Sequence, residues 1–386
     1  MRLERIAVTF KSPMFQVVLF FILFSFSYTA LAEVDLKALR STYSQAPKAW
    51  PKPELSAGVA HREIGLLSDP VHPPSNPFSK TKAELGRRLF FDPKLSRSGQ
   101  IACASCHDRD LGWADGRTVS FGHNRRAGKR NAPSVENAAF WHTLFWDGRA
   151  QSLEQQALMP IQDPLEMNMT LPELVARLNA DPSYQTAFKQ VFGMKTISAK
   201  QVAKALATYQ RTIVSRRSDF DYFLLARTQS NPRIQQAYNQ KLSDQALWGL
   251  HLFRTKARCM NCHNGPLFSD NGFHNIGLTY YKREYEDLGR YLVTGKASDV
   301  GKFKTPSLRG VMNSKPWMHN GLLADMEGVM AVYNAGGFRF QGDSADPLAP
   351  VTSPLLQPLS LSQAEQQALV AFMEALTPYP SGGVIR

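Results

Sequence analysis

Two copies of one five-residue motif account for every cysteine in the chain. They are Cys103-Ala-Ser-Cys106-His107 and Cys259-Met-Asn-Cys262-His263. The pattern C-x-x-C-H is the attachment signature of c-type haem, in which each thiol bonds one vinyl group and the adjacent histidine becomes an axial iron ligand. A redox dithiol would not need the histidine, whereas a four-cysteine zinc site is an alternative that the residue types leave open. The spacing predicts two covalently bound c-type haems and no disulfide.

Similar segments precede the two motifs. Residues 86–90 and 249–253 both follow the pattern G-x-x-L-F. Leu247, Leu250 and Phe253 recur at helical spacing and would form an apolar stripe on the haem side of a helix. We therefore expect a mainly α fold with two cytochrome-c-like haem domains related by duplication.

The first 32 residues have the features of an export signal. Three basic residues precede an almost entirely apolar stretch at residues 15–26, and Ala30-Leu31-Ala32 supplies a small-x-small cleavage pattern. An uncleaved anchor is the alternative, because residues 14–32 approach membrane-spanning length. We expect a signal peptide over residues 1–32 and export to the periplasm.

The rest of the chain divides into three parts. Residues 33–79 contain seven prolines, which predicts an extended N-terminal segment. Residues 198–214 have helical periodicity and a polar exit, so we place a boundary near residues 220–240. This gives one haem domain over residues 80–225 and another over 226–386, which ends in an amphipathic helix with a capping-box start.

Composition narrows the class of protein. The 386 residues are 43% hydrophobic and 20% charged, which is ordinary for a globular protein and excludes a collagen-like or disordered chain. Neither a repeat of solenoid length nor a basic run interleaved with aromatics is present, so nucleic-acid binding is not expected. The formal charge is +13, and removing the three basic residues and one acidic residue of the export signal leaves +11. This charge favours anionic partners.

Further motifs resemble one family. They are Leu89-Phe-Phe-Asp92, Arg130-Asn131-Ala-Pro133, Phe145-Trp146-Asp147-Gly148-Arg149-Ala150, Pro160-Ile-Gln-Asp-Pro-Leu-Glu166, Phe268-Ser-Asp-Asn-Gly-Phe-His274-Asn, Phe303-Lys-Thr-Pro-Ser-Leu-Arg309 and Pro316-Trp-Met-His319-Asn-Gly321. Their order and spacing resemble those of the bacterial di-haem cytochrome c peroxidases and their relative MauG, which matures methylamine dehydrogenase. The resemblance implies haems near the domain interface, a peroxidatic domain over residues 80–225 and an electron-transfer domain over 226–386.

The resemblance assigns the reaction with peroxide to the first haem, with His107 as its proximal ligand. Glu166 and Gln156 stand where the family places its distal glutamate and glutamine. A carboxylate can move the peroxide proton to the leaving oxygen, and an amide can orient peroxide or water. Trp146 matches a tryptophan between the haems that could carry an electron. Composition alone would make the polar pair a solvated helix face and Trp146 a core aromatic.

His123 lies 16 residues after His107, where the peroxidase branch keeps a removable sixth ligand of the first haem. Such a ligand blocks peroxide until the other haem is reduced and the loop moves. The loop at residues 115–131 contains three glycines, so it could move at low energetic cost, as a switch segment must. It also contains four arginines, and the arginine-rich stretch after His123 departs from the peroxidase pattern. An exposed loop histidine is the alternative.

For the second haem, the resemblance implies His263 as the proximal ligand. The peroxidases place a methionine 14 residues beyond the histidine of the Pro-x-x-His motif, but the same count from His319 reaches Tyr333. A tyrosine there is the MauG arrangement. A phenolate favours Fe(III) and higher states, whereas a thioether favours Fe(II). Met330, one helical turn earlier, is the rival ligand.

An inter-haem calcium site is also implied by the resemblance. Asn131 and the backbone carbonyls near Ser314 and Pro316 match its positions, and oxygen ligands suit this hard cation.

Three functions fit these residues. The first is a periplasmic peroxidase that reduces hydrogen peroxide to water with electrons from a small donor such as cytochrome c. The second is a MauG-like oxidase that uses peroxide to modify Trp or Tyr side chains of a partner protein. The third is an electron carrier, which would not need Glu166 and Gln156. The basic chain suits an acidic donor or an acidic protein substrate, and the sequence is compatible with a homodimer.

Overall fold

The computed structural model describes residues 34–194 and 196–378, and the architecture below belongs to the unit Leu36–Arg386. The predicted signal peptide at residues 1–32 lies outside the described residues. Helices and loops dominate, with one two-stranded sheet in the described chain, in agreement with a mainly α fold. In those same residues no helix combines the length and the apolar character needed to cross a membrane.

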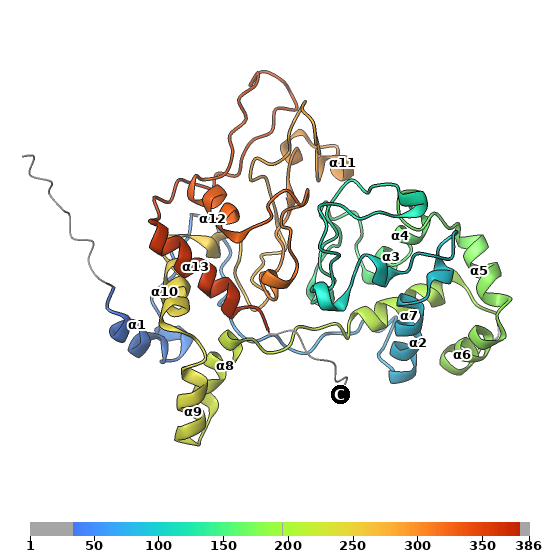
Figure 1. The fold of residues 1–386 in the computed structure, drawn as a ribbon, viewed down its shortest axis with the longest axis horizontal. Coiled ribbons are helices and arrows are strands. Elements are labelled where there is room, and N and C mark those ends of the chain that lie inside the picture. The colour runs from blue at the N-terminus through green and yellow to red at the C-terminus, as the bar shows by residue number, and fades with distance from the viewer. Residues whose placement is uncertain (1–33, 195, 379–386) are drawn as a thin grey trace, which may run out of the picture. The chain divides into compact units, whose positions relative to one another are not determined.

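The first helix group consists of α2–α7, and its long members α2 and α7 lie side by side (Figure 1). The hydroxyl groups of Ser79 and Ser198 cap these two helices by accepting hydrogen bonds from backbone N–H groups of the first turn. Their apolar faces enclose a core that includes Leu89 and Phe188. The elements are α2 (Lys80–Phe90), α3 (Leu153–Gln156), α4 (Met159–Gln162), α5 (Leu171–Asn179), α6 (Pro182–Phe192) and α7 (Ala199–Gln210).

The second helix group combines α1 with α8–α13, and here α10 and α13 are the paired helices (Figure 1). They enclose a core that includes Phe253 and Phe372. The predicted capping box at the start of α13 is confirmed, because Ser362 and Glu365 exchange side-chain-to-backbone hydrogen bonds. The elements are α1 (Leu36–Tyr43), α8 (Asp219–Leu225), α9 (Pro232–Asn239), α10 (Asp244–Arg254), α11 (Tyr291–Thr294), α12 (Met326–Asn334) and α13 (Gln363–Ala375).

The proline-rich N-terminal segment is not only extended: it also forms a helix and contributes to a core. It begins with α1 and then places Tyr43, Trp50 and Ile64 in the core of the second helix group. The Trp50 indole donates a hydrogen bond to the backbone oxygen of Tyr43, 3.0 Å away. Prolines keep much of this segment out of helices, but its apolar side chains are buried all the same.

Two glycines allow matching helix crossings. A Cβ added to Gly86 of α2 would lie 2.0 Å from the backbone oxygen of Ala205 in α7. A Cβ added to Gly249 of α10 would lie 1.9 Å from the backbone oxygen of Ala368 in α13. Only glycine permits such close backbone approach. The crossings fix where α2 and α10 lie against their partner helices, and each of the two helices is followed by a C-x-x-C-H motif.

The short sheet and α12 complete the second helix group. Strand β1 (Phe273–His274) pairs antiparallel with β2 (Phe303–Lys304), with Phe273 opposite Lys304. The Asp325 carboxylate caps α12 by accepting a hydrogen bond from the Gly328 N–H group, 2.6 Å away. The helix ends before Gly336, whose φ of 80° suits a helix terminator.

Replacing Gly249 with alanine should destabilise the protein by about 1–3 kcal/mol, the usual cost of overpacking a core. The reason is the 1.9 Å approach of the new Cβ to Ala368. Gly86→Ala should act in the same way. The free energy of unfolding in denaturant measures the effect. Gly65→Ala is the control, because nothing lies within 4 Å of a Cβ there. An equal loss at Gly65 would contradict the crossing argument.

Candidate functional site

Both C-x-x-C-H motifs hold their histidine ring in the same way. The Nδ1 atom of His107 lies 3.1 Å from the backbone oxygen of Trp113, and that of His263 lies 3.0 Å from the backbone oxygen of Phe268. A hydrogen bond at Nδ1 fixes the ring and leaves Nε2 as the free nitrogen for a metal. Burial also lowers the pKa of both histidines, so the neutral, ligating form is favoured.

The four cysteines are free thiols and form no disulfide with one another. Each motif folds as a short 3₁₀ turn, Cys103–Ser105 and Cys259–Asn261. Burial raises the pKa of the first cysteine in each motif, Cys103 and Cys259, to about 12. The four do not gather into one metal-binding group in the described chain, which contains them all, so a four-cysteine zinc site does not fit. Free thiols beside an oriented histidine fit covalent haem attachment.

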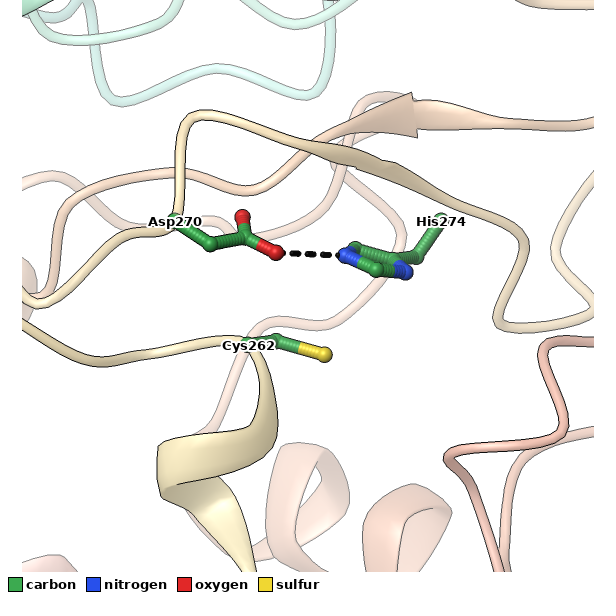
Figure 2. A group of neighbouring side chains, drawn as sticks. All are labelled: Cys262, Asp270 and His274. Carbon is green, nitrogen blue, oxygen red and sulfur yellow. Dashed lines mark hydrogen bonds and ion pairs between the residues drawn. The ribbon is translucent and has the colours of Figure 1, made fainter. Parts of the chain in front are cut away.

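Figure 2 shows Cys262 beside a hydrogen-bonded pair that the sequence did not assign, Asp270 and His274. The Asp270 carboxylate lies 2.7 Å from His274 Nε2. Burial opposes the charged imidazole, but the hydrogen bond to Asp270 and the nearby Cys262 raise the pKa of His274 to about 10. Because Cys262 belongs to the attachment motif, we regard this group as part of the second haem site.

A largely apolar cavity, called here the central cavity, opens around the second motif. Its walls include Cys259, Cys262 and His263 together with two side chains of α12, Met330 and Tyr333. Burial raises the pKa of the Tyr333 phenol, and the two cysteines of the motif add to this shift. The structure thus brings both candidate axial ligands, Met330 and Tyr333, to the same cavity as His263.

The first motif faces a second group of predicted residues. The N–H group of His123 donates a hydrogen bond to the backbone oxygen of Glu166, 2.7 Å away. A Cβ on Gly122 would lie 2.0 Å from the backbone oxygen of Leu165, so the loop is closely packed there. The Nδ1 atom of His123 is buried without a hydrogen-bond partner. His123 therefore lies against the segment that carries Glu166, rather than in open solvent.

Glu166 and Gln156 are half-buried, the latter at the end of α3. Burial and the neighbouring Asp163 raise the pKa of Glu166 to about 7, against the opposing charge of Arg149. A carboxyl group with this pKa can both accept and release a proton near neutral pH.

Trp146 is held by hydrogen bonds at its indole and at its backbone, and the backbone bond links the two helix groups. Its indole Nε1 donates to the backbone oxygen of Asn131 at 2.9 Å, and its own backbone oxygen accepts from the Lys304 N–H group at 2.8 Å. Its ring meets that of His319 edge-on, with centroids 6.5 Å apart. The Asn131 N–H group in turn donates to the His319 backbone oxygen at 2.8 Å. Trp146 is thus held between the Asn131 segment and the segments that carry Lys304 and His319.

The predicted calcium residues come together with Trp146. Asn131, Ser314 and Pro316 all line the central cavity. The Asn131 side-chain nitrogen donates to the backbone oxygen of Arg117 at 2.8 Å, which orients the amide group.

Arg130 is a further residue that sequence reasoning did not assign a role. Its guanidinium contacts Asp147 and Asp287, each at 2.6 Å. All three side chains are largely buried, so the arrangement ties the two helix groups together beside Asn131. Arg130 and Asp147 stand in motifs that carried the family resemblance, but nothing in their spacing revealed this contact.

Comparison with known proteins identifies the family. Residues 80–229 match the model of the di-haem cytochrome c peroxidase family. The methylamine utilization protein MauG of Methylorubrum extorquens is 40% identical over 80% of this chain and 82% of its own length. Cytochrome-c peroxidase IdrP1 of Denitromonas iodatirespirans is 37% identical over 81% of this chain and 86% of its own length.

A solved structure agrees with these relatives. The crystal structure of a MauG-like protein associated with microbial copper homeostasis is 32% identical, with a TM-score of 0.71 over 81% of this chain and 94% of that one. The chain described here therefore belongs to the di-haem cytochrome c peroxidase and MauG family. Membership implies two c-type haems, which the two oriented histidines and four free thiols fit.

Substituting both cysteines of one motif with alanine should halve the haem content. The Cys259→Ala, Cys262→Ala protein should contain one haem per chain instead of two, because only one pair of thioether bonds can form. The pyridine haemochrome spectrum of the denatured protein measures this ratio. The matched change at Cys103 and Cys106 should give the same value. Unchanged haem content, or bound zinc in its place, would contradict the assignment.

Proposed function

We propose that the chain is an exported, periplasmic di-haem peroxidase that reduces hydrogen peroxide to water with electrons from a small redox protein such as cytochrome c. The observation that carries this proposal is the half-buried Glu166 carboxyl group, whose pKa of about 7 suits proton transfer. Its charge acts on the pKa of Cys103 and Cys106, so it lies near the first C-x-x-C-H motif. A pure electron carrier would not need such a group. Relatives named as cytochrome c peroxidases support the reaction class.

The reaction needs two electrons and two protons for each peroxide, which leaves as two molecules of water. His107 would hold the iron of the first haem, and this haem would supply the redox chemistry for peroxide reduction. Glu166 takes the proton from the attacking peroxide oxygen and returns it to the leaving oxygen. The Gln156 amide orients the peroxide. Trp146, held at both ends by hydrogen bonds, lies in the electron path from the second site.

Other features complete the proposal. The matched crossings at Gly86 and Gly249 support a duplication, with haem domains over residues 80–225 and 226–386. The N-terminal segment at residues 33–79 joins the core of the second domain, and residues 1–32 direct export. Asn131, Ser314 and Pro316 line one cavity. Asn131 and the backbone carbonyls near Ser314 and Pro316 would supply oxygen ligands to a calcium ion. The basic chain docks an acidic donor protein, as a monomer or as a homodimer.

A second candidate function is MauG-like oxidation of Trp or Tyr side chains in a partner protein. It is favoured by Tyr333, whose phenol lies in the central cavity with His263. As an axial ligand, a phenolate would make the second haem a poor electron acceptor.

The two functions predict different reactions of the fully oxidised protein with one equivalent of hydrogen peroxide. If His123 ligates the first iron, the oxidised wild-type protein stays inert and reacts only after one haem is reduced. His123→Ala should then react at once, at least 10-fold faster, because the blocking ligand is gone. Stopped-flow absorption and EPR spectra measure both. An immediate reaction of the wild type, with a persistent two-equivalent oxidised state, would replace the peroxidase by the MauG-like function.

The role of Glu166 predicts a pH dependence. Its pKa of about 7 is raised, so the carboxylate that accepts the proton is present above this pH and is lost below it. The second-order rate constant with peroxide should therefore rise with pH, with a midpoint of about 7.

Glu166→Gln should remove this step and lower the rate by roughly 10²–10⁴-fold, the usual contribution of a general base. The exposed Glu84→Gln on α2 is the control and should behave as wild type. A midpoint that persists in Glu166→Gln would assign the titration to another group.

A further inference from the structure

Lys304, at the end of β2, is a buried lysine that forms no ion pair with any described acidic residue. The residue is 3% exposed, and its Nζ atom has no hydrogen-bond partner among the described residues. Nζ lies 3.3 Å from the centre of the Trp141 ring, whose own Nε1 is also buried and without a hydrogen-bond partner. Both side chains line the central cavity. Buried polar groups are normally paired, so this arrangement points to a ligand.

A partner of this ammonium group must offer a hydrogen-bond acceptor, and an anion would in addition neutralise the buried charge. The neighbouring acid Asp270 is hydrogen-bonded to His274 at 2.7 Å and forms no ion pair with Lys304 within 4.0 Å. Burial lowers the pKa of Lys304 to about 7, so the charged form depends on an added counter-charge.

Other basic groups on the cavity wall already have acidic partners. Arg309 contacts Asp221 at 2.9 Å, and Arg258 lies 3.7 Å from Glu54. His319 is also buried with an unpartnered Nε2, but burial lowers its pKa to about 3, so it carries no charge to neutralise. Arg258 Nε is also buried without a hydrogen-bond partner, but Lys304 differs from it in having no acidic partner within 4.0 Å among the described residues.

We propose that Lys304 binds a carboxylate of the second haem, one of its propionates, with Trp141 Nε1 as a neighbouring donor. The inference rests on the two haems of the proposed function. The same cavity is lined by the attachment residues Cys259, Cys262 and His263. A haem bound there would bring its carboxylates into an apolar space. A buried carboxylate is costly unless it pairs with a positive charge, and Lys304 can supply that charge.

This contact would act on the potential of the second haem. A fixed positive charge near the ring disfavours the ferric iron and raises the reduction potential. It opposes the effect of an anionic Tyr333 ligand. The Lys304 N–H group also donates to the backbone oxygen of Trp146 at 2.8 Å, so the same residue connects the haem carboxylate to the segment between the sites.

A crystal structure of the holoprotein, grown without multivalent anions, tests the contact directly. Lys304 Nζ should lie about 2.7–3.2 Å from a propionate oxygen of the second haem. Bonding of Nζ to Asp270, to a free anion such as chloride, or to a propionate of the first haem would overturn the proposal. Peroxidase activity does not enter this readout, so a failure of the proposed function is distinguishable from a failure here.

Redox titrations followed by absorption and EPR provide the second test. Lys304→Met should keep two haems and lower the potential of the second haem, with that of the first unchanged. Lys304→Arg should keep most of the wild-type potential, because the charge remains. Lys302→Met is the matched control, since Lys302 is two residues away and pairs with Asp299 at 3.1 Å. No shift in Lys304→Met, or an equal shift in Lys302→Met, would overturn the proposal.

Discussion

The hydrogen bond between a histidine Nδ1 atom and a backbone oxygen is the interaction on which both candidate haem sites depend. His107 makes it with Trp113, and His263 makes it with Phe268, at nearly equal distances. Each bond needs a loop that returns to the ring after the motif. Each motif, in turn, needs a helix whose end is set by a glycine crossing, Gly86 or Gly249. The helix pairs are therefore the frame that keeps Nε2 directed away from the backbone and free for iron.

Trp146 and its neighbours form one of the contacts between the two helix groups. Its indole and backbone bond to Asn131 and Lys304, and the nearby Arg130 forms buried ion pairs with Asp147 and Asp287. Buried, doubly paired guanidinium groups hold their geometry well. A residue that is to pass electrons between two sites benefits from such rigidity, because its distance from each site stays constant.

The ionisable groups around the two C-x-x-C-H motifs differ. Around the first motif, burial keeps Glu166 near the point of proton exchange, which suits acid–base work. Around the second, the buried groups are a phenol, a thioether, an Asp270–His274 pair and the unpartnered Lys304. These groups can set the charge and potential of a cofactor, and Glu136 on the same cavity wall, whose pKa burial raises to about 7, can exchange protons as Glu166 can.

The sequence by itself predicted the haem-attachment residues from the spacing in C-x-x-C-H and the helical class from apolar periodicity. It indicated the family through the resemblance of its other motifs. It also indicated the α13 capping box and placed Met330 and Tyr333 on one helix. Only the tertiary structure decided which residues meet across the chain. Lys304, Asp270 and Arg130 looked like ordinary charged residues, and their roles arise from burial and from partners distant in sequence. The core position of Tyr43, Trp50 and Ile64 was hidden for the same reason: local prolines predict an extended backbone, whereas the burial of side chains depends on what packs over them.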